Sequence, residues 1–161
     1  MNNVNITVER EQSVYMIDVD MNDRVFDIKW DSGAADTVIS IGALDDSLSP
    51  EELVKFKVYC ENKGKCKKQF ISATGDVFYG YLVSAHNAVI GGALVQNFCY
   101  YIVLENKRDI ALLGFDFIDR CKYTHEPHSD ILITAVDLDG YGELEEAMDS
   151  DEILTYVDSF H

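Results

Sequence analysis

The sequence predicts a mainly β domain over residues 1–136 and an acidic, helical extension over residues 137–161. Three observations support this prediction. The length of 161 residues suits one compact domain with an extension. The hydrophobic content of 47% is typical of a globular protein and too high for general disorder. Apolar and polar residues alternate with a period of two in the N-terminal part of the chain, as in half-buried strands.

The first predicted strands form a hairpin that leads into a distinctive loop. Residues 14–19 and 25–30 alternate as strands do, and Asn22-Asp23 between them is a turn signal. The hairpin therefore delivers the chain directly into Asp31-Ser32-Gly33-Ala34.

A helix is predicted after this loop. Ser49 is a suitable N-cap, Pro50 suits the first turn, and Glu52 completes a capping box. The helix is expected to continue through Phe56 towards Glu61. Residues 62–65, in the basic patch of the sequence, are expected to end it.

The middle of the chain is predicted to be rich in strands, with turns at residues 74–76 and 91–92. The predicted strands are 69–73, 77–84, 87–90, 94–104 and 131–136. Residues 110–118 are predicted to form an apolar strand, a glycine turn at Gly114 and the start of a short helix.

The acidic extension carries apolar residues at roughly helical spacing, which predicts a helix that packs on its own domain or on another subunit. These residues are Leu144, Ala147, Met148, Ile153, Leu154, Tyr156 and Val157. Residues 137–143 resemble half of a calcium loop. Tyr141 and Met148 occupy positions where that loop needs oxygen ligands, so no calcium site is predicted.

The formal net charge of −16 makes nucleic acid and anionic membranes unsuitable partners, because both need clustered cations. A solvated acidic surface is the simplest interpretation, and attraction to basic substrates is the alternative. Residues 1–12 are polar and lack the apolar core of a secretion signal, and no apolar run is long enough for a membrane span. We therefore expect a cytoplasmic protein.

The four cysteines, Cys60, Cys66, Cys99 and Cys121, are expected to be free thiols in a reducing cytosol. The spacing between Cys60 and Cys66 is too long for a CxxC redox pair. His125 and His128 would supply a second pair for zinc on paper, but no zinc-finger framework surrounds them. No metal and no organic cofactor is predicted.

Two segments together carry the functional signal. The first is Asp31-Ser32-Gly33-Ala34 with the following Thr37-Val38-Ile39, and the second is Leu112-Leu113-Gly114 within residues 110–118. Their order, separated by a predicted hairpin, resembles the retropepsin-like aspartic proteases over roughly residues 14–136. The resemblance implies a closed β-barrel of the acid protease fold, with an inserted helix and a short helix after Gly114.

The same resemblance implies site residues and a partner. The implied catalytic residues are Asp31, Ser32 and Gly33. Substrate would be bound by residues after the loop and in a mobile flap over residues 73–80, namely Ala34, Ala35, Asp36, Gly75, Val77, Phe78, Tyr79 and Gly80. The chain holds a single Asp-Ser-Gly loop, so the resemblance implies a homodimer in which each subunit supplies one Asp31.

The chemistry of such a site explains these residue types. Two carboxylates that share one proton activate a water and protonate the leaving amine, and their mutual repulsion separates their pKa values. The pair titrates as a unit. Gly33 lets the backbone approach closely, and Ser32 matches the hydroxyl that joins the two loops in the family. A peptide substrate is the implied partner.

The chain departs from the retroviral pattern at three positions. Ala35 and Phe115 stand where retroviral enzymes carry an Asp and an Arg that form an ion pair, so both partners are absent together. This resembles cellular and bacterial retropepsin-like domains. Trp30 is bulkier than the usual aliphatic residue.

Two other interpretations stay open at this point. One is a dimeric peptide-binding or assembly module with the same fold and little or no turnover. The other is a monomeric β domain whose Asp-Ser-Gly turn is accidental, because this tripeptide is common turn chemistry.

Overall fold

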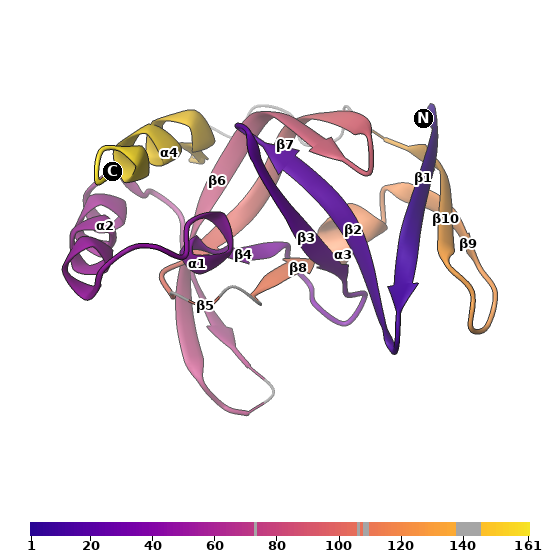
Figure 1. Cartoon of the computed structure of the whole chain (residues 1–161), viewed down its shortest axis with the longest axis horizontal. Helices are drawn as coiled ribbons and strands as arrows, with labels where there is room; N and C mark the ends of the chain where they lie inside the picture. Colours follow the sequence, from indigo (N-terminus) through magenta and orange to yellow (C-terminus); the bar gives the residue numbers. More distant parts are fainter. Residues whose placement is uncertain (73, 106, 108–109, 138–145) are drawn as a thin grey trace.

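The computed structural model describes residues 1–72, 74–105, 107, 110–137 and 146–161 (Figure 1). Its strands are β1 (Asn2–Glu11), β2 (Val14–Met21), β3 (Arg24–Trp30), β4 (Val38–Ser40), β5 (Lys67–Ile71), β6 (Val77–Ile90), β7 (Ala93–Val103), β8 (Ala111–Leu113), β9 (Cys121–His125), β10 (Ile131–Val136) and β11 (Met148–Asp149). Its helices are α1 (Ile41–Leu44), α2 (Pro50–Lys63), α3 (Phe115–Ile118) and α4 (Ser150–Asp158).

Six strands close into a barrel. Around the barrel, β2 pairs with β3, β3 with β8, β8 with β4, β4 with β7, β7 with β6, and β6 with β2 again. The pairs β3–β8 and β4–β7 are parallel, and the other four are antiparallel. The closed, mainly β architecture confirms the predicted fold class.

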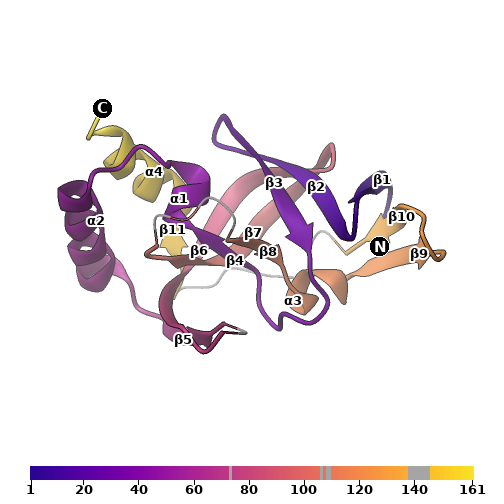
Figure 2. The same ribbon diagram turned by 60° about the horizontal axis from the view of Figure 1, so that its bottom comes forward.

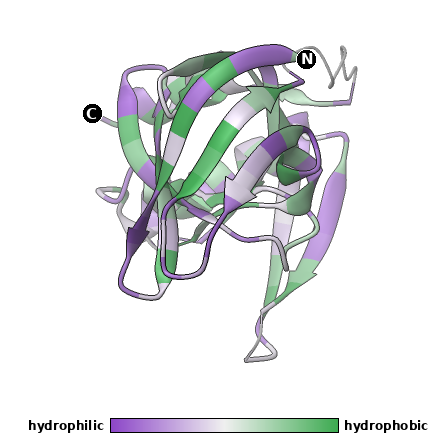
Figure 3. Cartoon of the chain, turned by 90° about the vertical axis from the view of Figure 1, so that its right-hand side faces the viewer, coloured by the Kyte–Doolittle hydropathy of each residue, from purple (hydrophilic) through white to green (hydrophobic). Residues whose placement is uncertain are grey.

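A smaller antiparallel layer extends the barrel at one end, where β1 pairs with β10 and β10 with β9 (Figures 1 and 2). The prediction did not include β1, because charged and polar residues surround its two fully buried side chains, Ile6 and Val8. Figure 3 shows this alternation of apolar and polar residues along the strands. The prediction also missed β9, which is mostly exposed and has no strong apolar alternation.

The hairpin before residue 31 is confirmed. Strands β2 and β3 pair from Met16 with Lys29 to Met21 with Arg24, slightly beyond the predicted bounds. Asn22 and Asp23 form the turn, with φ values of 54° and 64°. Two successive residues with positive φ match the right-handed twist of the flanking strands.

The predicted capping of α2 is confirmed. The Ser49 side chain accepts a hydrogen bond from the Glu52 N–H, and the Glu52 side chain accepts one from the Ser49 N–H. The helix ends at Lys63, one half turn beyond the expected Glu61. Phe56 and Cys60 are fully buried and anchor α2 to the barrel.

The predicted break between residues 84 and 87 was wrong, because β6 runs without interruption from Val77 to Ile90. This long strand pairs with β5, β7, β2 and β11 along its length, so tertiary pairing outweighs the polar residues His86 and Asn87. The turn at Gly91-Gly92 is confirmed, with φ values of 57° and 85°. Strand β5 begins and ends two residues earlier than predicted, at Lys67 and Ile71.

The helix of the acidic extension packs on its own chain. Ile153, Leu154 and Val157 of α4 are almost fully buried and belong to the same apolar core as the barrel. Met148 lies in β11, which pairs in parallel with β6, so the predicted inclusion of Met148 in a helix was wrong. Leu144 and residues 138–143 lie outside the described residues. Within the described residues no helix has the length and apolar character to cross a membrane.

The pairing of β2 with β3 places two carboxylates side by side, and this arrangement yields a pH-dependent prediction. Asp18 and Asp27 are direct cross-strand partners. Desolvation, a hydrogen bond with Asp18 and the like charge of Asp18 raise the pKa of Asp27. Because the pKa of Asp27 is higher in the folded state than in the unfolded chain, ionising Asp27 destabilises the fold. This cost is absent below the pKa of Asp27 in the unfolded chain and is complete above its pKa in the folded state.

Replacing Asp27 with Asn should therefore raise the free energy of unfolding at pH 7 by roughly 0.2–1 kcal/mol, the range for like charges opposite one another. The gain should vanish near pH 3, and urea unfolding at both pH values measures it. Asp20→Asn is the matched control, because Asp20 lies opposite Val25. An equal gain for Asp27→Asn at both pH values would contradict the coupling.

Candidate active site

The Asp31 loop leaves β3 and turns back at once. The Asp31 N–H donates to the Leu113 carbonyl at 3.0 Å, which ties the start of the loop to β8. The Gly33 N–H donates to Oδ1 of Asp31 at 3.1 Å, and the Ala34 N–H donates to the Asp31 carbonyl at 3.1 Å. The loop backbone therefore holds one oxygen of the Asp31 carboxylate in place.

A buried hydroxyl joins this loop to the turn after β8. The Thr37 side chain is fully buried. Its hydroxyl donates to Oδ1 of Asp116 at 2.7 Å and accepts a hydrogen bond from the Gly114 N–H at 3.1 Å. Oδ2 of Asp116 accepts from the Thr37 N–H at 3.1 Å, and Oδ1 also accepts from the Phe117 N–H at 2.9 Å. The three donors to Asp116 thus come from two segments that cross here, the one after β3 and the one after β8.

Burial and the hydrogen-bond network act on the Asp116 carboxyl group in opposite directions. Burial raises the pKa of its carboxyl group, although the hydrogen bonds from Thr37 and Phe117 act in the opposite direction. Asp116 lies behind the loop, where its carboxylate serves as a hydrogen-bond acceptor. Its contribution to the site is positional.

The crossing of the two segments requires glycine at position 114. A Cβ atom placed there would lie 2.4 Å from both the carbonyl carbon and the oxygen of Asp36. Backbone atoms cannot move aside cheaply, so any side chain at this position would force the loop and the turn apart. Gly114 therefore serves the packing of the loop against the turn after β8.

Backbone hydrogen bonds join residues 34 and 35 of the loop to the start of α3. The Phe115 N–H donates to the Ala34 carbonyl at 2.7 Å, and the Asp116 N–H donates to the Ala35 carbonyl at 3.1 Å. The side chains of Ala35 and Phe115 are exposed, and Phe115 retains 50% of its accessible surface. The loop is therefore held without a charged pair at these positions.

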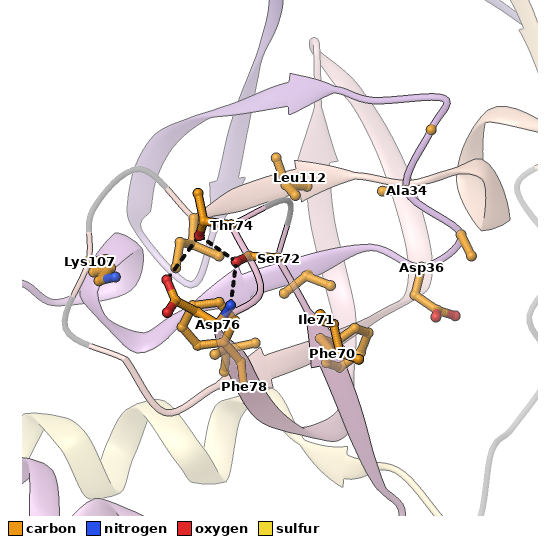
Figure 4. A pocket seen from close by; sticks show the side chains of 15 residues that line it. Ala34, Asp36, Phe70, Ile71, Ser72, Thr74, Asp76, Phe78, Lys107 and Leu112 are labelled. Carbon is orange, nitrogen blue, oxygen red and sulfur yellow. Dashed lines mark hydrogen bonds between the residues drawn. The ribbon is translucent and has the colours of Figure 1, made fainter.

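A cleft of about 480 Å³ lies between the loop and the β5–β6 hairpin (Figure 4). Its lining is mainly apolar, with a few charged groups. The lining residues are Gly33, Ala34, Ala35, Asp36, Val38, Phe70, Ile71, Ser72, Thr74, Asp76, Phe78, Val103, Lys107, Ile110 and Leu112. The cleft thus brings together residues from the loop, the hairpin, β7 and the segment before β8.

Five of the site residues implied by sequence line this cleft, namely Gly33, Ala34, Ala35, Asp36 and Phe78. Asp31 and Ser32 lie in the same loop but not in the lining. Gly80 is buried at the base of the hairpin, where a Cβ atom would lie 3.0 Å from the Phe70 ring.

Val77 and Tyr79 lie on the opposite face of the hairpin from Phe78, as alternation along a strand requires. They are about half exposed and line a different cavity.

The sequence interpretation missed several cleft residues, among them Phe70, Lys107 and Leu112. The alternation of β5 and β6 was a usable signal for Phe70, because Phe70 pairs directly with Phe78 and so shares its face. No local signal existed for Lys107, whose place at the cleft depends on how the chain returns from β7 to β8.

The tip of the hairpin is a tight, hydrogen-bonded turn. The Ser72 N–H donates to the Asp76 carbonyl, and the Gly75 N–H donates to the Ser72 carbonyl. Side-chain hydrogen bonds link Ser72 with Thr74 and Thr74 with Asp76 (Figure 4). Gly75 has φ of 87°, a conformation that glycine adopts readily. Ala73, the first residue of the expected flap, lies outside the described residues.

An ion pair joins the hairpin to the loop. Nζ of Lys68 on β5 lies 2.5 Å from Oδ2 of Asp36. The two side chains remain partly exposed, so the pair contributes about 0–1 kcal/mol to stability. It links one wall of the cleft to the other.

Trp30, directly before Asp31, faces the terminal layer and away from the cleft lining. Its ring packs edge-to-face on Tyr123 of β9, with centroids 5.1 Å apart. The Trp30 side chain is 9% exposed, whereas that of Tyr123 is 42% exposed. The large Trp30 side chain therefore packs between β9 and the barrel and does not narrow the cleft.

The residues considered for metal binding are dispersed. All four cysteines are free, and Cys60 is buried in α2. His125 at the end of β9 forms a hydrogen bond with the Tyr15 hydroxyl. Within the described residues no group of three or more His, Cys, Asp or Glu side chains is arranged to hold a metal ion.

The barrel, the loop and its glycine turn together define the fold of the retropepsin-like aspartic proteases. The chain is similar in structure to a retropepsin-like aspartic protease from Rickettsia conorii, with a TM-score of 0.53 and 19% sequence identity. The match covers 83% of this chain and 98% of the Rickettsia chain. No family model and no curated protein sequence matches the chain. The likeness therefore establishes a common fold.

The Thr37 network yields a testable prediction. Thr37→Val removes the hydroxyl with little change of shape and leaves the Gly114 N–H without its acceptor and Oδ1 of Asp116 without one of its two donors. Because an unmade buried hydrogen bond costs about 1–3 kcal/mol per group, the free energy of unfolding should fall by roughly 2–4 kcal/mol.

Urea unfolding measures this change, and Thr37→Ser is the control because it keeps the hydroxyl. Equal losses for the valine and serine variants would show that the methyl group, and not the hydrogen-bond network, carries the stability.

Proposed function

We propose that this protein is an aspartic endopeptidase that acts as a homodimer, with Asp31 of each subunit in one shared site. The observation that carries the proposal is the Asp31 loop itself: its carboxylate is held by the Gly33 N–H, and the loop is fastened behind through Thr37 and Gly114. The loop borders a cleft large enough for peptide side chains. The shared fold with a retropepsin-like aspartic protease supports the same function.

The proposed chemistry needs a second carboxylate, and the chain contains a single Asp-Ser-Gly loop. A second copy would supply the other Asp31, giving an isologous interface. The Ser32 side chain is exposed and has no hydrogen-bond partner among the described residues, so it is available to a facing loop. Strand β9 is an edge of the described sheet and contacts Trp30 directly before Asp31.

In the proposed reaction the two Asp31 carboxylates share one proton and hold a water between them. The ionised carboxylate acts as base towards the water, and the protonated one donates to the substrate carbonyl oxygen. Extended peptide would lie between the Asp31 loops and the hairpins, bound chiefly through its backbone. The apolar lining by Phe70, Phe78 and Leu112 favours apolar side chains next to the cleaved bond.

Cleavage of a diverse peptide library from pH 4 to pH 7 tests the mechanism. Asp31→Asn should lower the rate at least about a hundredfold, because the amide cannot accept the proton of the water. The variant should keep its unfolding midpoint and its affinity for uncleaved peptide. An unfolded variant would also fail to cleave, so circular dichroism is recorded alongside the assay to show that the Asp31→Asn protein is folded.

Peptide binding by both proteins without cleavage by either would favour the alternative, a peptide-binding or assembly module with this fold. That module would use the cleft and its apolar lining and would not need the Asp31 carboxylate.

A mixing experiment tests the shared site. When an equal amount of the Asp31→Asn chain is exchanged into the wild-type protein, mixed dimers form, and activity should fall to about half its original value. An active site within one chain would give unchanged activity. Thr37→Ser, which keeps Asp31, is the control for the exchange, and sedimentation velocity confirms that dimers form.

A further inference from the structure

A second cavity lies on the other side of the β5–β6 hairpin, between the hairpin and α2. Its volume is about 200 Å³. Helix α2 contributes Lys57 and Glu61, and the hairpin contributes Lys67 and Tyr79 among others. We call this cavity and its rim the α2–hairpin groove. It lies outside the candidate catalytic cleft and depends on the inserted helix.

Exposed apolar side chains line the groove on the hairpin side and lie near it on α2. Val77 and Tyr79 on the outer face of the hairpin are 47% and 48% exposed. On α2, Val54 and Val58 are 58% and 49% exposed. Helical spacing places these two valines on the same face as Lys57. Exposed apolar groups on two facing elements are typical of a surface that another chain covers.

The segment that forms the α2 side of the groove and leads into β5 is the most basic stretch of an acidic protein. Residues 55–68 contain six of the chain's 13 Lys and Arg residues and a single acidic residue, Glu61, while the whole chain has a net charge of −16. The rest of the chain carries seven Lys and Arg residues and 28 Asp and Glu residues, so an acidic segment meets mostly like charge there. At this groove it meets lysines.

Two of these lysines are available for a partner. Nζ of Lys67 lies 4.7 Å from the centre of the Tyr79 ring and 5.8 Å from that of Tyr81, so the rings orient the ammonium group. Within the described residues neither Lys57 nor Lys67 forms an ion pair, whereas Lys68 on the opposite face pairs with Asp36.

Glu61 and Glu105 also line the groove, so its cations occupy defined points and do not form a uniform positive surface. This arrangement suits a peptide that alternates acidic and apolar side chains better than a polyphosphate backbone, which requires continuous positive charge.

The groove and the candidate catalytic cleft share one lining residue. Phe78 lines both cavities, one on each side of the hairpin. Nζ of Lys107 in the cleft lies 5.5 Å from the centre of the same ring. Phe78 therefore lies between the two cavities, so a substrate bound in the cleft would pass over the hairpin to reach the groove.

We propose that the α2–hairpin groove is a docking surface for an acidic segment of the protein substrate, carrying apolar residues and lying outside the bond to be cleaved. That the partner is a substrate rests on the proposed function. Lys57 and Lys67 would bind its carboxylates, and Val77 and Tyr79 would contact its apolar side chains.

Binding is tested first, independently of cleavage. The probe is a short fluorescent peptide that alternates Glu and Leu, added to the Asp31→Asn protein and followed by fluorescence anisotropy. The variant Lys57→Gln/Lys67→Gln, made in the same background, should bind about fivefold more weakly, as expected for the loss of two exposed ion pairs. The control Arg10→Gln/Lys29→Gln removes the same charge from β1 and β3 and should bind as before.

Two outcomes of this measurement would overturn the proposal. One is an equal loss of affinity in the control, which would indicate a long-range charge effect. The other is equally tight binding of a Gln-Leu peptide, which would show that the lysines do not select carboxylates. If the double variant changes self-association by sedimentation but not peptide affinity, a second copy of the chain covers the groove, and the proposal also fails.

Cleavage provides the second arm. A library peptide that the wild type cleaves is extended with the Glu-Leu or the Gln-Leu sequence. The acidic extension should lower KM about fivefold and leave kcat unchanged, and Lys57→Gln/Lys67→Gln should abolish this difference. Equal KM values for the two extensions would overturn the docking role. Absence of any cleavage would instead contradict the proposed function, while the binding arm would still report on the groove.

Discussion

The candidate site depends on the crossing of two chain segments behind Asp31. The segment after β3 and the turn after β8 approach so closely that position 114 has no room for a side chain. The Thr37 hydroxyl and the Asp116 carboxylate pair with the backbone groups that this crossing buries. Because these hydrogen bonds hold both segments, the Asp31 loop has a defined position relative to the barrel. The parallel pairing of β3 with β8 joins the same two segments within the barrel.

Attachment through the backbone explains how this chain manages without charged residues at positions 35 and 115. The carbonyl groups of Ala34 and Ala35 accept hydrogen bonds from the first residues of α3. The side chains at both positions are exposed, so an ion pair between them would add only about 0–1 kcal/mol to stability. The Asp36–Lys68 pair lies further out, where solvent weakens it, and joins the loop to the hairpin. The rigid part of the site is therefore neutral at these positions, and its charges lie at the rim of the cleft.

Much of the fold was predictable because local physics and tertiary structure agree. The Asn22-Asp23 turn, the Ser49 capping box and the Gly91-Gly92 turn each depend on a few neighbouring residues. The elements that were missed or divided wrongly depend on distant partners. Strand β1 buries two side chains that acquire neighbours from β10, and β6 continues through its polar centre because other strands pair with it along its length. Such pairings have no local signature.

For the candidate site, the sequence by itself determined the Asp31 loop, the glycine turn at 114 and five of the residues that line the cleft, because these form short motifs with strict backbone requirements. Only the tertiary structure decided what surrounds them. It placed Phe70 and Lys107 at the cleft, moved Val77 and Tyr79 to the outer face of the hairpin, and set α2 beside that face. The physical reason is that a motif specifies its own backbone, whereas a cavity is formed by side chains from segments that meet only after the barrel closes.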